Sequence, residues 1–199
     1  CAFYDSIPCL FFTGQVGQFH IKKDKFHRQR GFQETDVREL FSSITKFSYQ
    51  IKSVDEIDYI IDKAVYIAKN GRPGPVVIDV PFNIQTAKVD LKKQKKFIPA
   101  NEIINNSKTL KIIKNITNQI QNAKRPVIIA GGGITISNLN KDFKDFIKKI
   151  NVPFVTSWSS QDLTTFNDKL YFGSVGRHGN QSANKIIDSS DLVLSLGYR

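Results

Sequence analysis

Small and hydroxyl-bearing residues follow three of the apolar runs in this sequence, at places where a ligand could bind. Three glycines at 131–133 follow the apolar run 126–130, and glycine there lets a backbone approach a phosphate closely or adopt a positive φ angle. The segments 156–158 (TSW) and 197–199 (GYR) follow two further runs. Ligands of open parallel sheets bind beyond the carboxyl ends of the strands. We therefore expect these three loops to meet at one edge of a sheet and to line a ligand site.

A second glycine-rich segment, at 173–179, precedes a predicted helix and carries a cation and an imidazole, Arg177 and His178. The guanidinium groups of Arg177 and Arg199 could pair with a pyrophosphate. The dinucleotide fingerprint G-x-G-x-x-G is incomplete, because Ile136 stands where its last glycine would be. A standard nicotinamide site is therefore not favoured. The glycines could also form a tight turn, and His178 could be an ordinary surface histidine.

Neither a metal site nor a hydrolase triad is indicated. The three histidines, His20, His27 and His178, lack the spacing of metal ligands and have no cluster of cysteines or carboxylates beside them. No nucleophile-elbow motif supports a Ser/His/Asp triad. We therefore predict no metal ligand in this chain.

The strands that must position these loops are short apolar runs. Such runs predict buried strands at 8–13, 75–80, 126–130, 152–155 and 192–196. A polar, basic segment at 15–30, a short helix at 35–41 and an extended piece at 44–50 separate the first two strands. Residues 81–106 carry much charge and no sustained period, as in a linker.

Apolar residues at helical spacing lie between most of the strands. They predict a helix between Ser53 and Gly71, one beyond Ser107, and two over 139–150 and 182–187. Ser53 and Glu56 form a capping-box pattern, and Gly71 takes the position just past the helix end. The alternation of strand and helix predicts parallel βαβ units and an α/β fold.

The composition is that of an ordinary globular chain of 199 residues, 40% hydrophobic and 24% charged. No apolar run is long enough to cross a membrane, and the start carries no signal-peptide pattern. Two cysteines, Cys1 and Cys9, suit a reducing compartment, so we expect a cytoplasmic protein. Because there is no methionine and the last strand stops as its loop begins, we also expect an internal fragment of a longer polypeptide.

The net charge of +11 raises the question of a nucleic-acid partner. Lysines are scattered along predicted helices or gathered at 88–96, and that segment lacks the interleaved aromatic residues of a single-strand binding platform. We expect a solvated linker there, and neither nucleic acid nor membrane as a partner.

Taken together, the motifs resemble thiamine diphosphate-dependent enzymes of the acetolactate synthase large-subunit family. In the first half they are 13–16 (TGQV), 31–36 (GFQETD), 44–46 (ITK), 71–76 (GRPGPV) and 79–81 (DVP). In the second half they are 125–127 (RPV), 131–133 (GGG), 176–179 (GRHG), 183–184 (AN) and 191–199 (DLVLSLGYR). Their order and approximate spacing hold over nearly the whole chain.

The resemblance implies the middle of a three-domain enzyme with parallel sheets. Residues 1–89 would end an N-terminal pyrimidine-binding α/β domain, 90–106 would be a linker, and 107–199 would be the first half of a Rossmann-like central domain. The C-terminal domain with its magnesium-ligating motif, and the glutamate that activates thiamine, would lie outside this chain. The fragment alone would therefore be inactive, and the whole enzyme would be a homodimer or homotetramer.

The implied chemistry is attack of the thiamine ylide on a 2-oxo acid, loss of carbon dioxide, and transfer of a two-carbon carbanion to an acceptor carbonyl. By resemblance, Gln33 borders the thiazolium and the substrate, with Phe32 beside it. A carboxamide suits this place, because it can donate a hydrogen bond to a developing enolate oxygen without adding charge. The implied cofactors are thiamine diphosphate, Mg²⁺ and a flavin without net redox role, FAD. The flavin contacts carried over are Arg72, Gly131, Gly132, Gly133, Thr156, Ser157, Trp158, Val175, Gly176, Arg177, His178, Gly197 and Arg199.

Two departures from the family lie near its substrate channel. The chain is longer between Val16 and Phe32, where the added piece is basic, and Phe82 replaces a common lysine. The leading prediction from the resemblance is pyruvate condensation to acetolactate, a step of branched-chain amino-acid biosynthesis. The two departures leave other acceptors open. The alternatives are a related thiamine-dependent decarboxylase or carboligase acting on a sugar-like acceptor, and a non-catalytic nucleotide- or nucleic-acid-binding module.

Overall fold

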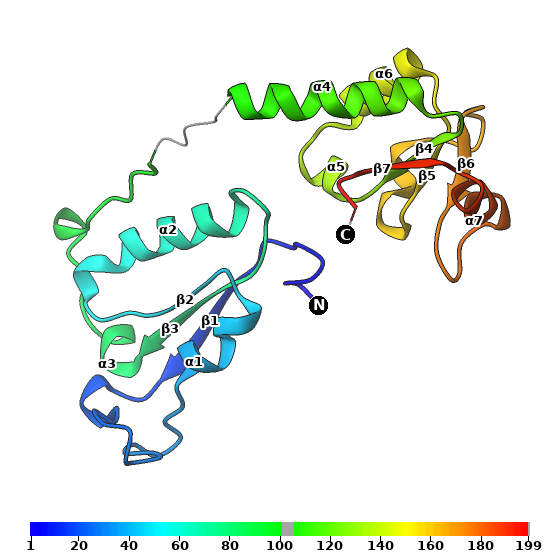
Figure 1. The fold of residues 1–199 in the computed structure, drawn as a ribbon. Helices are drawn as coiled ribbons and strands as arrows, with labels where there is room; N and C mark the ends of the chain where they lie inside the picture. Colours follow the sequence, from blue (N-terminus) through cyan, green and yellow to red (C-terminus); the bar gives the residue numbers. More distant parts are fainter. Residues whose placement is uncertain (101–105, 199) are drawn as a thin grey trace. The chain divides into compact units, whose positions relative to one another are not determined.

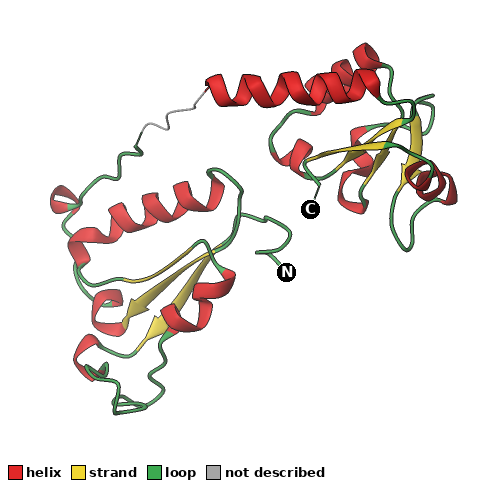
Figure 2. Cartoon of the chain, in the orientation of Figure 1, coloured by secondary structure: helices red, strands yellow, loops and turns green. Residues whose placement is uncertain are grey.

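A computed structural model describes residues 1–100 and 106–198, which form two compact units, Cys1–Glu102 and Ile103–Arg199 (Figure 1). Each unit contains one sheet, and every recorded strand pair in both sheets is parallel. Helices connect and cover the strands in both units (Figure 2). The predicted α/β class with parallel sheets is therefore confirmed.

The first unit is built on a three-stranded sheet of order β1-β3-β2. Its strands are β1 (Leu10–Gln15), β2 (Phe47–Gln50) and β3 (Val76–Pro81), and its main helix is α2 (Ile57–Lys69). Ile60, Ala64 and Ala68 of α2 are buried against Val76 and Ile78 of β3. Shorter helices are α1 (Val37–Phe41) and α3 (Phe82–Gln85), with 3-10 turns at Gln18–His20, Ser42–Ile44, Val54–Glu56 and Leu91–Lys93.

Both ends of the long helix are formed as the sequence predicts. Ser53 and Glu56 make the reciprocal capping box at the turn that leads into α2. At the other end, Asn70 is the C-cap and Gly71 follows with φ +60°, a left-handed conformation that glycine adopts at little cost. The chain then turns into β3.

The second unit contains a four-stranded sheet of order β6-β5-β4-β7. Its strands are β4 (Pro126–Ala130), β5 (Phe154–Thr156), β6 (Tyr171–Ser174) and β7 (Leu192–Leu196). Its helices are α4 (Asn106–Asn122), α5 (Gly133–Ile136), α6 (Asn140–Ile150) and α7 (Gln181–Asp188), with a 3-10 segment at Trp158–Leu163. Phe143 and Ile147 of α6 form the core with Ile128, Phe154 and Leu163.

Besides shifts of a few residues at other element ends, the structure differs from the predicted elements in the following details. The first strand runs to Gln15 instead of ending at 13, because Gly14 and Gln15 pair with Val80 and Pro81 of β3. The segment predicted as a linker from residue 81 begins with the helical turn α3. Strand β6 was not predicted at all, because its four residues form no apolar run. It is held in the sheet by its pairing with β5 and by the packing of Tyr171 on Phe154, whose ring centroids lie 5.3 Å apart.

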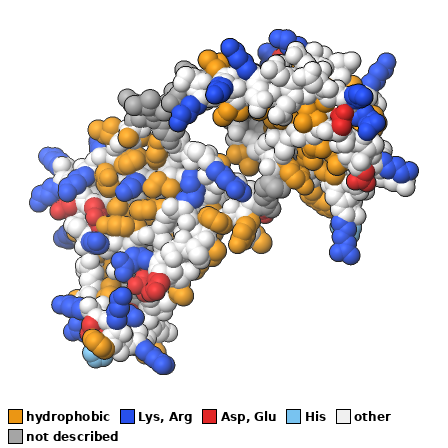
Figure 3. All heavy atoms as spheres, viewed as in Figure 1, with side chains coloured by type: hydrophobic (Ala, Val, Ile, Leu, Met, Phe, Trp, Pro, Cys, Tyr) orange, Lys and Arg blue, Asp and Glu red, His pale blue; other side chains and the backbone are white. Residues whose placement is uncertain are grey.

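No helix in the described part of the chain combines the length and the apolar character needed to span a bilayer. On the face shown in Figure 3, lysine and arginine side chains are spread over both units among polar and apolar ones.

Candidate functional site

The residues singled out from the sequence fall into two groups, one in each unit. Phe32, Gln33 and Arg72 belong to the first unit, and the remaining described residues belong to the second. Arg199 lies outside the described residues. Each group is described within its own unit.

Gln33 stands on an exposed turn in a left-handed backbone conformation, with φ +65°. Phe32 beside it is 86% exposed. A non-glycine residue with this conformation is uncommon, costs roughly 1–3 kcal/mol, and persists only where its surroundings impose it. The turn therefore has anchors that outweigh its local cost, and the neighbouring residues supply them.

The first anchor is the side chain of Glu34, which is buried although it is charged. Its carboxylate accepts backbone N–H bonds from Lys22 (2.8 Å), Arg30 (2.7 Å) and Gly31 (3.2 Å). Burial by itself raises the pKa of Glu34, but these three N–H donors outweigh it and leave the pKa below its ordinary value. The ionised carboxylate thus closes the basic loop that precedes the turn.

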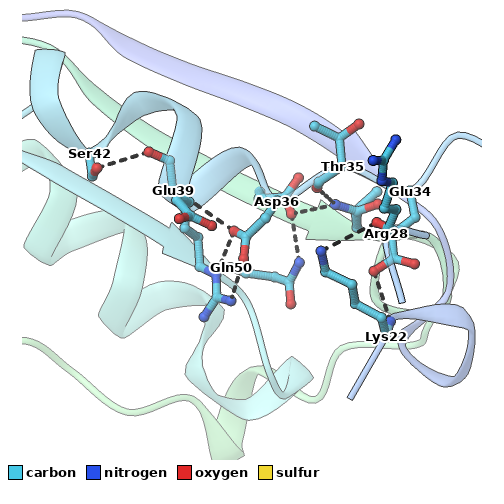
Figure 4. A network of polar contacts seen from close by, with 11 residues as sticks. Lys22, Arg28, Glu34, Thr35, Asp36, Glu39, Ser42 and Gln50 are labelled. Carbon is cyan, nitrogen blue, oxygen red and sulfur yellow. Dashed lines mark hydrogen bonds and ion pairs between the residues drawn. The ribbon is translucent and has the colours of Figure 1, made fainter. Parts of the chain in front are cut away.

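The second anchor is the backbone carbonyl of Thr35, which accepts a 2.6 Å hydrogen bond from Nε2 of Gln15 at the end of β1. The same nitrogen lies 3.1 Å from Oδ2 of Asp79 in β3. Asp79 is fully buried and joins the strands around it. Figure 4 shows this polar network, with Thr35 and Glu34 beside the turn and Gln50 on the neighbouring strand.

Beyond the turn, the chain enters α1 through Asp36, whose carboxylate accepts the backbone N–H of Glu39 at 3.2 Å. Burial raises the pKa of Asp36, whereas that N–H bond and the ion pair with Arg38 lower it, with a net lowering. Gln33 is therefore held between a loop closed by the Glu34 carboxylate and a helix capped by Asp36.

In the second unit, the loops that follow the strands are joined at the carboxyl edge of the sheet. The backbone N–H groups of Gly131 and Gly133 donate to the carbonyls of Leu196 (2.8 Å) and Gly197 (3.0 Å). Ser157 N–H donates to Ala130 (2.8 Å). The loop after β6 joins them, because Val175 N–H donates to the carbonyl of Thr156 at 2.9 Å. The structure thus brings together the three loops expected at this edge and the glycine-rich segment at 173–179.

Two of the three adjacent glycines are required by the chain itself. A Cβ on Gly131 would lie 2.2 Å from the carbonyl oxygen of Gly197, and one on Gly133 would lie 2.8 Å from the Cα of Gly197. The loop after β4 crosses the loop after β7 at this point. Gly176 is different, because it has φ +126° and a Cβ there would meet nothing within 4 Å.

The edge of this sheet carries groups that fit a phosphate-containing ligand. Within the described residues, the backbone N–H groups of Gly132, Arg177 and His178 donate to no other residue. The side chains of Arg177 and His178 are exposed, and Trp158 is 76% exposed. Free N–H donors, a cation and an open indole ring are the groups that bind a phosphate and stack on a flat ring. A ligand with a phosphate and a flat ring therefore fits this edge of the sheet.

Two predicted contacts are turned inward. Thr156 is fully buried, and its hydroxyl lies 3.0 Å from the phenolic oxygen of Tyr171. The hydroxyl of Ser157 lies 2.7 Å from that of Ser160, which in turn donates to the carbonyl of Ala130. These hydroxyls brace the loop after β5 against β4 and β6.

Arg72 follows the end of α2 in the first unit. Its Nε donates to the hydroxyl of Ser6 at 2.8 Å, and its Nη2 lies 3.3 Å from the carbonyl oxygen of Tyr4. The guanidinium group is therefore oriented by the N-terminal segment of its own unit.

Several residues with clear structural roles were not singled out from the sequence, namely Gln15, Glu34, Lys46 and Asp79. The signal for Asp79 was present: a charged residue inside the apolar run VVIDV must be hydrogen-bonded if the run is a buried strand. Gln15 and Glu34 gave no such signal. The bond from Gln15 to Thr35 spans 20 positions and the bond from Lys22 to Glu34 spans 12, and neither is a spacing that a regular helix or strand would show.

Comparison with known proteins gives the same family for both units. Residues 113–199 match the family model of the thiamine pyrophosphate enzyme central domain, thiamine pyrophosphate being another name for thiamine diphosphate. Over 198 residues the chain is 34% identical to the acetolactate synthase large subunit of Lactococcus lactis, covering 100% of this chain and 33% of that protein.

Other relatives come from distant organisms. The chain is 35% identical to a probable acetolactate synthase large subunit of Methanococcus aeolicus, covering 98% of this chain and 32% of the relative. It is 32% identical to a chloroplastic acetolactate synthase of Nicotiana tabacum, covering 100% and 29%. The chain thus spans about a third of the length of the curated relatives it matches.

Proposed function

This chain belongs to the thiamine diphosphate-dependent enzymes of the acetolactate synthase large-subunit family, and we propose that it forms part of an enzyme that condenses 2-oxo acids with loss of carbon dioxide. The observation that carries this proposal is the extent of the similarity. It covers both units, including the Gln33 turn that lies outside the match to the central-domain model. Neither alternative from the sequence is favoured by these relatives.

The two units take the domain roles expected from the resemblance. Residues 1–89 form the end of a pyrimidine-binding domain, 90–106 a linker, and 107–199 the first half of the central domain. The compact units and their parallel sheets support this assignment.

Gln33 is the residue of this chain that meets the substrate. Thiamine diphosphate supplies a carbon nucleophile for the 2-oxo acid carbonyl and a sink for the charge left by decarboxylation. The exposed carboxamide of Gln33 donates a hydrogen bond to the oxygen on which negative charge develops, and it adds no net charge to the site. Phe32, also exposed, covers the reacting atoms with an apolar ring and keeps water away.

FAD, which undergoes no net redox change in this family, would be held at the carboxyl edge of the second sheet. The N–H groups of Gly132, Arg177 and His178 would bind phosphate oxygens, and the exposed indole of Trp158 would stack on a flat ring. Arg72 and Arg199 are carried over as flavin contacts from the resemblance to the family alone. Mg²⁺ is held by residues outside this chain, and the whole enzyme is a cytoplasmic homodimer or homotetramer acting on small 2-oxo acids such as pyruvate.

The test uses the whole enzyme of which this chain is part. We expect pyruvate consumption that depends on added thiamine diphosphate and Mg²⁺, and a yellow preparation or a rise in Tm on adding FAD. An enzyme that consumes no pyruvate under these conditions would contradict the proposal. An active enzyme that neither carries nor responds to FAD would remove the flavin from it.

A further inference from the structure

We propose that Gln15, anchored by the buried carboxylate of Asp79, is a positioning residue that holds the turn carrying Gln33 in its reactive place. The inference rests on the proposed function for the role of Gln33, but the anchoring itself concerns only contacts within this chain.

Asp79 is the centre of the anchor. Its side chain is 0% exposed, and it stands on the middle strand, opposite Thr13 of β1 and Gln50 of β2. Thr13 donates its hydroxyl to Oδ1 at 2.8 Å, whereas Gln15 and Gln50 donate their Nε2 groups to Oδ2 at 3.1 and 2.7 Å. Among the described residues, the recorded ion pairs do not include Asp79. A buried carboxylate with neutral donors only is costly unless every donor is well placed.

A carboxylate accepts hydrogen bonds and donates none, so it decides which way a glutamine amide faces. The NH₂ group of Gln15 must point toward Asp79, and its second N–H then points at the carbonyl of Thr35, 2.6 Å away. The amide oxygen of Gln15 accepts the backbone N–H of Val16 at 3.0 Å. All the polar capacity of this side chain is therefore used in one orientation.

This orientation has a consequence for Gln33, two positions before Thr35. The left-handed backbone of Gln33 is unfavourable in isolation and has to be imposed by its flanks. Glu34 holds the loop on one side through three N–H groups, and Gln15 holds the carbonyl on the other side. Without the bond from Gln15, the turn keeps its Glu34 clamp and its local backbone bonds but loses its side-chain link to the end of β1, and the carboxamide of Gln33 loses its fixed position.

Gln50 provides a matched control. It has the same side chain, it flanks β3 on the opposite side, and it donates to the same oxygen of Asp79. Replacing either glutamine removes one donor from the same buried carboxylate, so this part of the structural cost is shared by the two variants. Only Gln15 also reaches the Gln33 turn.

The experiment compares Gln15→Met with Gln50→Met in the whole enzyme. Methionine keeps the length of the side chain and removes its donors. We expect Tm to fall in both variants, and to fall further in Gln15→Met, which also loses its bonds to Thr35 and Val16. Hydrogen exchange of the amides at 31–36 should rise at least tenfold in Gln15→Met and stay near the wild-type rate in Gln50→Met. With pyruvate, kcat should fall about 10- to 100-fold in Gln15→Met with little change in KM, since small misplacements at a reacting centre cost up to that much.

Equal exchange at 31–36 in the two variants would overturn the proposal. Increased exchange in Gln15→Met with kcat equal to that of Gln50→Met would overturn the claim that the turn's position limits the reaction. A wild-type enzyme without activity would contradict the proposed function, whereas the exchange comparison would still decide the anchoring. If Gln15→Met does not fold, Gln15→Asn replaces it, because its amide is one methylene too short to reach Asp79 and Thr35 together.

Discussion

At the residue scale, the Gln33 turn combines three features that are rarely found together by chance. The backbone of Gln33 is left-handed and its carboxamide is exposed. Its neighbours are both held by hydrogen bonds, Glu34 by backbone N–H groups such as that of Lys22, and Thr35 by the side chain of Gln15. The surrounding contacts therefore offset the unfavourable backbone conformation of Gln33 and fix its exposed amide, as expected of a residue that acts on a substrate.

We predict that Gln33→Ala in the whole enzyme lowers kcat by about 10²- to 10³-fold while thiamine diphosphate still binds, since one donor to a developing oxyanion contributes that much. Gln33→Gly is the matched control. It removes the same carboxamide but relieves the positive φ, which is worth roughly 1–2 kcal/mol. We expect kcat to fall by a similar factor in both variants. In urea denaturation, Gln33→Gly should have a higher free energy of unfolding than Gln33→Ala. Unchanged turnover in both would show that Gln33 does not meet the substrate.

The Glu34 clamp gives a prediction about pH. Its folded-state pKa lies below the ordinary 4.5 of a glutamate, so its contribution to stability is present above about that pH and is lost as pH falls through the lower folded-state pKa. The free energy of unfolding should therefore differ most between wild type and Glu34→Gln near neutral pH, and the difference should shrink below pH 4.5. Denaturant titrations across this range measure it. Glu39→Gln, on the exposed surface of α1, is the control and should show a small difference throughout.

Gly133 gives a prediction about stability in the absence of ligand. A Cβ at this position would lie 2.8 Å from the Cα of Gly197. Gly133→Val should therefore lower the Tm of the second unit by several degrees without any FAD present. A variant with a normal ligand-free Tm that has lost only its response to FAD would contradict this and assign the glycine to the ligand instead.

At the element scale, the ITK and GRPGPV motifs are explained by the end of α2. Nζ of Lys46 donates to the last carbonyls of this helix, those of Ile67 and Asn70, and burial lowers its pKa. A Cβ on Gly74 would lie 3.1 Å from the Lys46 side chain. Glycine at this position thus leaves room for the cation that closes the helix.

We predict that Lys46→Met destabilises the protein by about 1–3 kcal/mol, because partly buried carbonyls at the helix end lose a charged donor. Lys69→Met is the control: it removes a charge from the same last turn, but its side chain is exposed. Its cost should stay within about 0.5 kcal/mol. Chemical denaturation gives the free energy of unfolding of both variants. An equal decrease in the two would show that the hydrogen bonds from Lys46 to the carbonyls contribute no more than a positive charge near the helix end.

How well each element could be predicted depended on where its stabilising contacts lie. Strands β4 and β7 were predicted to the residue, because apolar runs such as PVIIA and LVLSL are bounded by turns. Strand β6 could not be found, since only its pairing with β5 makes it a strand. The same holds for the candidate site: Gln33 was singled out through its motif and stays a prediction, whereas the Gln15–Thr35 contact depends on tertiary structure and left no trace in spacing.

At the scale of the whole molecule, the relatives span both units, and FAD binding tests whether Arg72 of the first unit has the proposed role. Arg72→Ala should abolish the FAD-dependent gain in stability, which for wild type is about 2.7 kcal/mol at a hundredfold excess over Kd. Because Arg72 also contacts Ser6, Ser6→Ala is the control, for it breaks that contact and keeps the guanidinium. Thermal shifts without FAD measure the loss of the Ser6 contact, and the further shift on adding FAD measures ligand binding. A wild-type FAD-dependent shift in Arg72→Ala would exclude Arg72 from the flavin site.

The central claim is that this chain is part of an enzyme that joins two 2-oxo acid molecules. The most direct measurement is the product balance of the whole enzyme with pyruvate, thiamine diphosphate, Mg²⁺ and FAD, followed by NMR of ¹³C-labelled substrate. The account predicts that each pair of pyruvate molecules consumed gives one acetolactate and one carbon dioxide. Pyruvate converted to carbon dioxide and acetaldehyde without acetolactate, or not converted at all, would contradict it.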